Sequence, residues 1–159
     1  MKTQHRPGLW LLAALLVAGA ARGAEAEALA LGFDKLASYE FVAPEDPAKA
    51  KEADAQIPER IRNFNDKKVL VTGFMLPVKM EAGLVTEFLL VKDPMMCCYG
   101  VMPKVNEWVV VRMTGKGVPP LMDVPITFEG TLQVGQLYEG GYLTGLYLLK
   151  GNRRIESKS

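Results

Sequence analysis

Apolar and polar residues alternate along the second half of the chain, and this period of two is the spacing of a β-strand with one buried face. The same stretches are enriched in Val, Leu, Ile and Phe, which favours strands. The pattern predicts five strands, over residues 68–78, 84–92, 107–114, 124–134 and 142–150. The connections expected between them are rich in glycine and proline and include residues 115–120, Gly135 and residues 140–141.

The fourth of these strands has the clearest pattern. One face carries Val124, Ile126, Phe128, Gly130, Leu132 and Val134. The other face carries Pro125, Thr127, Glu129, Thr131 and Gln133. In the first strand, Gly73 predicts a bulge or a point where the strand coils.

Strands of this length with internal glycines favour closure of the sheet, because a closed sheet has no exposed edges. The sequence therefore predicts a mainly β fold, a small five-stranded barrel like the oligonucleotide/oligosaccharide-binding (OB) barrel, with short helical segments at the N-terminal side. A small β-sandwich is the alternative, since the number of strands does not separate the two.

The region before the strands is different in character, since residues 25–56 are rich in alanine and charged residues. Residues 46–56 predict a short surface helix that Asp46 caps and in which Pro47 occupies the first turn. Four apolar side chains upstream would dock this arm on the domain: Phe33, Leu36, Tyr39 and Phe41. A second helical turn opens at residues 57–61, with Ile57, Ile61 and Phe64 on its apolar side. We thus expect an arm at 25–56, a barrel domain at 57–150 and a polar tail at 151–159.

The N-terminus resembles a secretory signal peptide. A short basic start is followed by residues 9–21, which carry no charge and number too few for a membrane span. Small residues suited to cleavage follow at 21–23 and 24–26, without a cysteine that could carry lipid. We expect residues 1–24 to be removed and the product to be soluble and periplasmic, with no other segment able to span a bilayer. An uncleaved anchor is the alternative.

Removal of this segment changes the chemistry that is available. The only histidine is His5, so the mature chain would contain no imidazole, which excludes His-based triads, His-ligated zinc and Cys–His nucleophile pairs. The remaining chain would have 16 basic and 18 acidic residues, a balance that does not suit nucleic acid. Carboxylates on the expected strands and loops are scattered and form no recognisable pair: Glu81, Glu87, Asp93, Glu107, Asp123 and Glu129.

The remaining candidates for chemistry lie in one loop, residues 93–103, with the sequence DPMMCCYGVMP. Cys97 and Cys98 are adjacent, so a disulfide between them would be a strained ring, easier to reduce than a structural bridge. The loop also holds three thioethers, Met95, Met96 and Met102. Two thiolates with thioethers nearby form a soft ligand set suited to a metal such as Cu(I). The expected loop-shaping residues are Pro94, Tyr99, Gly100 and Pro103.

Several motifs together resemble the bacterial family called domain of unknown function 3299, over residues 57–150. They include Gly73-Phe74-Met75-Leu76-Pro77, Cys97-Cys98-Tyr99-Gly100 and Asn106-Glu107. The resemblance implies an exported envelope protein with an OB-like barrel and implies no known reaction. It also implies that the double cysteine belongs to the family pattern, and that a transporter or another envelope protein is a partner.

We therefore predict a periplasmic binding or accessory module, non-enzymatic, with Cys97 and Cys98 as soft-metal ligands or reactive thiols. A thiol–disulfide redox protein or sensor that uses the same pair is one alternative. A structural or assembly module with dimerising cysteines is another. The structural alternative is that the cysteines and methionines only fill gaps in the core.

Overall fold

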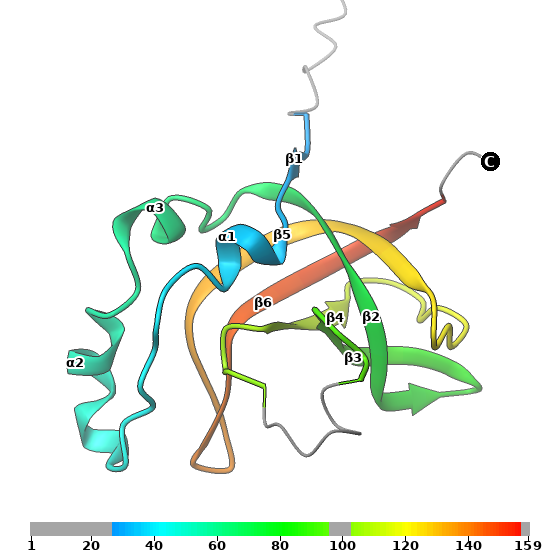
Figure 1. Ribbon diagram of the computed structural model, residues 1–159. Coiled ribbons are helices and arrows are strands. Elements are labelled where there is room, and N and C mark those ends of the chain that lie inside the picture. Colours follow the sequence, from blue (N-terminus) through cyan, green and yellow to red (C-terminus); the bar gives the residue numbers. More distant parts are fainter. Residues whose placement is uncertain (1–26, 96–102, 157–159) are drawn as a thin grey trace, which may run out of the picture.

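The computed structural model describes residues 27–95 and 103–156, and the six strands in these ranges form one mixed sheet (Figure 1). They are β1 (Leu29–Ala30), β2 (Lys68–Glu81), β3 (Leu84–Val91), β4 (Trp108–Met113), β5 (Pro125–Glu139) and β6 (Tyr142–Ile155). The order across the sheet is β1-β2-β3-β4-β6-β5, and β2 pairs in addition with β5. The prediction of a mainly β fold with short helices is confirmed, and the described strands do not divide into the two sheets of a sandwich.

Strand β2 is shared between two neighbours. Its first half, residues 68–74, pairs with β5, and its second half, residues 74–81, pairs with β3. The change of partner occurs at Gly73 and Phe74, in agreement with the predicted coil point. A Cβ at position 73 would lie 2.7 Å from the carbonyl oxygen of Val91, so only glycine permits this close approach of β3. The irregular pairing itself lies further on, between Pro77 and Met80.

The five predicted strands are present, but three predicted ends were wrong. Strands β2, β5 and β6 continue to Glu81, Glu139 and Ile155. Gly135, expected in a connection, lies inside β5 with a φ of 151°, at an irregularity in the pairing with β6. Strands β2 and β5 therefore extend into two long hairpins, β2–β3 with its tip at the lower right of Figure 1 and β5–β6 with its tip at the lower left.

The core follows the predicted alternation with instructive exceptions. In β5, Ile126, Phe128 and Leu132 are buried as expected, whereas Val124 precedes the strand and is exposed. Glu129 was expected on the solvent face but is buried, because Lys68 and Arg153 lie over its carboxylate. The short strand β1, parallel to β2, was not predicted, since two residues show no periodicity.

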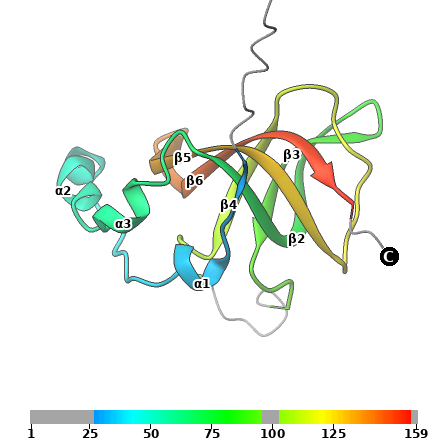
Figure 2. The same cartoon turned by 90° about the horizontal axis from the view of Figure 1, so that it is seen from above.

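The helices lie N-terminal to the long strands. They are α1 (Phe33–Leu36), the 3-10 helix η1 (Pro47–Lys49), α2 (Ala50–Asp54) and α3 (Glu59–Arg62). The predicted helix at 46–56 is confirmed as η1 and α2, and Asp46 Oδ1 accepts a hydrogen bond from the N–H of Ala48 at 2.9 Å. Figure 2 shows α2 and α3 together at one side of the sheet, beyond β5 and β6. Of the helices in the described ranges, none is long and apolar enough to cross a membrane.

The N-terminal arm docks as the sequence predicts. Phe33 and Leu36 are buried in the core cluster, and Tyr39 and Phe41 pack against it. The predicted signal peptide, residues 1–24, lies outside the described residues.

Candidate functional site

The cysteine loop predicted from the sequence leaves the sheet at the end of β3 and returns at the start of β4. Val91 pairs with Trp108, and the N–H of Lys92 donates to the carbonyl oxygen of Glu107 at 3.2 Å. Nζ of Lys92 lies 3.7 Å from Oε1 of Glu107. The two ends of the loop are therefore held side by side.

Three of the predicted ligands and loop-shaping residues are described. Pro94 and Pro103 are half-buried, and Met95 is 48% exposed. The N–H of Met95 donates to Asp93 Oδ1 at 2.8 Å, which forms a turn at the start of the loop. The other predicted ligands and shaping residues lie outside the described residues: Met96, Cys97, Cys98, Tyr99, Gly100 and Met102. Within 27–95 and 103–156, no group of three or more His, Cys, Asp or Glu residues is arranged to hold a metal.

Asn106 joins the returning end of the loop to the N-terminal arm. Its side chain is fully buried, and Nδ2 donates to the carbonyl oxygen of Tyr39 at 2.6 Å. Its Oδ1 has no hydrogen-bond partner among the described residues. Next to it, Glu107 Oε2 accepts from the N–H of Lys104 at 3.0 Å. The loop thus returns through a hydrogen-bonded segment in which Asn106 is buried.

The outer face of β3 and β4 carries a groove of about 280 Å³. Cross-strand pairs set its floor, because residues directly opposite each other point to the same face: Glu87 with Arg112 and Leu89 with Val110. Neighbouring side chains such as Phe88 and Val109 point the other way, into the core. The groove is lined by Val78, Glu87, Leu89, Trp108, Val110, Glu139 and Thr144.

Trp108 is fixed in this groove by a hydrogen bond and by a close approach to β6. Its Nε1 donates to the carbonyl oxygen of Thr144 at 2.9 Å. A Cβ at Gly145 would lie 3.3 Å from Nε1, so the absence of a side chain there lets the indole reach the strand. The ring is half-buried and lines the groove.

One guanidinium joins two carboxylates at the end of the groove. Arg112 Nε lies 3.2 Å from Oε2 of Glu87, and Nη2 of Arg112 pairs with Oε1 of Glu139. On the adjacent β2–β3 hairpin, Lys79 pairs with Glu81 at 2.8 Å, and this hydrogen bond raises the pKa of the lysine. Together these five groups carry one net negative charge.

The tip of the β5–β6 hairpin adds an exposed aromatic side chain. Tyr142 is 79% exposed. It pairs across the hairpin with Glu139, so both side chains lie on the same face. Because Glu139 lines the groove, Tyr142 extends that wall outward.

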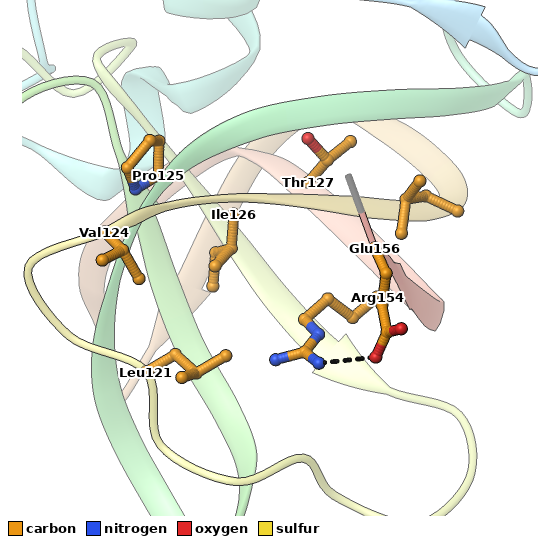
Figure 3. A pocket seen from close by; sticks show the side chains of 8 residues that line it. Leu121, Val124, Pro125, Ile126, Thr127, Arg154 and Glu156 are labelled. Atoms are coloured by element: carbon orange, nitrogen blue, oxygen red, sulfur yellow. Dashed lines mark hydrogen bonds and ion pairs between the residues drawn. The ribbon is translucent and has the colours of Figure 1, made fainter. Parts of the chain in front are cut away.

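A second hollow of about 450 Å³ lies at the start of β5 and the end of β6 (Figure 3). Its lining is Leu121, Val124, Pro125, Ile126, Thr127, Arg154, Ile155 and Glu156. Arg154 and Glu156 pair with each other at 2.9 Å, which neutralises the two charges (Figure 3). The groove over β3 and β4 is the stronger candidate, because it combines an aromatic ring, an apolar floor and several polar groups.

The groove was not predicted from the sequence. Trp108, Val110 and Arg112 lie two residues apart in a predicted strand, so their common face was visible in the sequence. The sequence did not show that this face lines a groove, because both faces of the strand carry apolar residues. Glu87 was placed among scattered carboxylates, and its neighbour Arg112 becomes apparent only through the register of β3 and β4.

Comparison with known proteins agrees with this fold. A family model described as "Protein of unknown function (DUF3299)" matches residues 24–153, which extends the resemblance found at 57–150 into the arm. The chain is also similar to a crystal structure of a DUF3299 family protein from Pseudomonas aeruginosa PAO1, at 23% identity and a TM-score of 0.60. This match covers 84% of this chain and 99% of that one, and at such an identity it shows the fold alone. A search of the curated proteins found no match.

Proposed function

The chain belongs to the DUF3299 family of proteins of unknown function, and we propose that it is an exported, non-enzymatic binding or accessory module. In this proposal the groove over β3 and β4 is the binding surface. The observation that carries it is Trp108, held in place by Thr144 within an apolar groove that has polar groups at its end. A few convergent polar groups in an apolar hollow are what a binding site requires.

In the same proposal the sheet closes as an OB-type barrel. The support is a ring of ladders, β2–β3, β3–β4, β4–β6, β6–β5 and β5–β2, which returns to the first strand. OB barrels bind their ligands on the second and third barrel strands, between the loops that join strands 1–2 and 4–5. The corresponding parts here are β3 and β4 and the two long hairpins, where the groove lies.

The pairing of charges favours binding over catalysis. Glu87 and Glu139 both form ion pairs with Arg112, so neither carboxylate is an unpartnered acid or base in the groove. Export is supported by the sequence of residues 1–24.

Photocrosslinking tests the groove without knowledge of its ligand. A benzoylphenylalanine in place of Tyr142, itself an exposed aromatic, should give an envelope adduct that is lost on adding Trp108→Ala. The same group in place of Val42, 71% exposed on the arm, is the matched control and should give none. Equal adducts from both positions would contradict the proposal.

A soft-metal site in the cysteine loop is a second candidate. It is favoured by the exposed Met95 thioether at the start of a loop whose two ends are held together. Cys97, Cys98 and Met95, with Met96 and Met102, would supply soft ligands for Cu(I). The loop that carries these side chains returns to the sheet at Trp108, the first residue of β4.

Trp108 gives this candidate a direct assay. The two tryptophans of the chain are Trp10 and Trp108, so the mature protein would contain Trp108 alone. We expect Cu(I) to quench its emission stoichiometrically in reduced, anaerobic protein and not in the Cys97→Ser/Cys98→Ser variant. Identical weak responses would remove the metal candidate. Reversible loss of about 2 Da without metal would instead favour the redox alternative, and a reducible dimer the assembly alternative.

A further inference from the structure

We infer that the groove over β3 and β4 binds an oligosaccharide, neutral or bearing amino groups, whose sugar rings lie against Trp108 and Tyr142. The inference rests on the proposed function, because it names the ligand class of the same groove. Three features carry it: the two aromatic side chains, the polar groups around them, and the pairing state of the strands beneath.

The aromatic side chains suit the apolar faces of sugar rings. Trp108 is held by its Nε1 hydrogen bond to the carbonyl oxygen of Thr144, so the ring needs little ordering when a ligand arrives. Tyr142 is 79% exposed and extends the wall formed by Glu139. The C–H groups of a pyranose face carry partial positive charge and pack favourably on the negative face of an aromatic ring.

The polar groups of the groove can accept hydrogen bonds from the hydroxyl groups of a sugar. Glu87 and Glu139 each give one oxygen to Arg112, and a carboxylate accepts about four hydrogen bonds in all. Thr144 Oγ1 donates to the carbonyl oxygen of Leu137 at 3.2 Å and keeps lone pairs that can accept. Several acceptors beside an aromatic ring match a ligand that presents many O–H donors.

The charge of the groove restricts the class of oligosaccharide that it can bind. The charged side chains that line the groove are Glu87 and Glu139, and both pair with the single guanidinium of Arg112, so a polyanion would meet repulsion there. Neutral sugars are not repelled by these carboxylates, and protonated amino groups are attracted to them. The volume of about 280 Å³ is near the lower end of small-molecule pockets, about 300 Å³, so it accommodates part of a chain that continues along the open face.

The strand pairing argues against an added peptide strand. β3 is paired with β2 and β4, and β4 is paired with β3 and β6. The floor of the groove therefore has no free edge to which a peptide backbone could add. A peptide would have to bind through side chains alone.

Titration of the mature protein with defined oligomers tests the inference, with Trp108 emission as the readout. The probes are tetra-N-acetylchitotetraose (neutral), chitotetraose (amino-bearing), an oligogalacturonate of the same length (acidic) and an alternating Lys-Leu octapeptide. We expect a saturable response to the neutral or amino-bearing sugar and a weaker one to the acid. Tyr142→Ala should weaken sugar binding about fivefold, the worth of one aromatic contact of about 1 kcal/mol. The exposed Val42→Ala should leave it unchanged.

A second variant keeps the test independent of Tyr142. Glu139→Gln should reduce the preference for the amino-bearing over the neutral sugar, because it removes a negative charge from the groove. Three results would overturn the inference. They are no change in Trp108 emission with any sugar, a change with the peptide alone, and sugar binding that Tyr142→Ala leaves unchanged. If the Tyr142 photocrosslink still forms in those cases, the proposed binding function stands and only the ligand class fails. If that photocrosslink is also absent, both fail.

Discussion

The phenol of Tyr147 links a buried strand to the N-terminal arm. Tyr147 is fully buried in β6, and its hydroxyl donates to the carbonyl oxygen of Leu36 at 2.8 Å. The hydroxyl of Tyr39 lies 2.9 Å from the hydroxyl oxygen of Tyr147. Burial raises the pKa of both phenols, so both remain neutral hydrogen-bonding groups across the physiological range. This small network holds the end of α1 against the sheet.

The variant Tyr147→Phe removes the network without changing the shape of the core. It leaves the carbonyl oxygen of Leu36 buried without this donor, so we expect the free energy of unfolding to fall by about 1–2 kcal/mol. Tyr39→Phe is the matched control, because it removes a hydroxyl and spares the bond to Leu36, and its effect should be smaller. Urea unfolding measures both, and an equal or larger loss in Tyr39→Phe would contradict this role of Tyr147.

At the scale of single residues the sequence predicted burial better than polar contacts. The docking of Phe33 and Leu36 was predicted, because large apolar residues in a polar arm need a partner surface. The bond from Tyr147 to Leu36 was not, since it joins residues 111 positions apart. Trp108 was missed for a related reason, because its importance depends on Gly145 and Thr144 of another strand.

At the scale of elements, Glu129 ties three neighbouring strands together. From β5 its carboxylate lies 3.4 Å from Nζ of Lys68 in β2 and 3.0 Å from Nη2 of Arg153 in β6. The hydrogen bond to Arg153, together with the charges of Arg153 and Lys68, holds the pKa of Glu129 below its ordinary range. The charged carboxylate is thus more stable in the folded than in the unfolded chain.

This pKa predicts a pH dependence of stability. The contribution of Glu129 is fully present above the pKa of an unfolded glutamate, about 4.3, and is lost as the pH falls through the lower folded value. The difference in unfolding free energy between wild type and Glu129→Gln should therefore shrink between about pH 6 and about pH 3. Arg153→Met, which keeps the carboxyl and removes its main partner, should show a weaker dependence than wild type. Parallel wild-type and Glu129→Gln curves in urea melts would show that this carboxylate does not contribute.

The contact between β5 and β6 sets a second test at this scale. A Cβ at Gly130 would lie 2.3 Å from the carbonyl oxygen of Lys150, which is backbone and cannot turn away. Gly130→Ala should separate the strands and cost about 1–3 kcal/mol or more. Gly115→Ala is the control, because no atom lies within 4 Å of its added Cβ. Thermal unfolding of the two variants compares them, and an unchanged midpoint in Gly130→Ala would contradict the close packing.

Strand identity was predictable from periodicity, whereas strand length was not. The alternation found all five long strands, because one face of each packs on the core. Their ends were misplaced at Val78, Val134 and Lys150. The ends of β2 and β5 extend into hairpins past the core, and the end of β6 pairs with the start of β5. In these extensions polar residues are held by ladder hydrogen bonds, so the apolar pattern stops before the strand does.

At the scale of the whole molecule, the arm and the sheet share one core. Leu31, Phe33 and Leu36 belong to the same buried cluster as Phe88, Phe128 and Leu149. The sequence predicted a boundary at residue 57 because composition changes there. Composition does not report contacts between distant segments, and the family match from residue 24 spans both parts. We therefore expect arm and sheet to unfold together.

Leu36→Ala tests this cooperativity, because Leu36 is fully buried and its carbonyl oxygen accepts the bond from Tyr147. The lost contacts should lower the free energy of unfolding by about 2–5 kcal/mol. Trp108 emission reports the sheet, and far-ultraviolet circular dichroism reports the whole chain, so the two urea midpoints should shift together. Val42→Ala, on the same arm but 71% exposed, should leave both in place. If Trp108 unfolds at its wild-type midpoint in Leu36→Ala, the sheet does not depend on the arm for its stability.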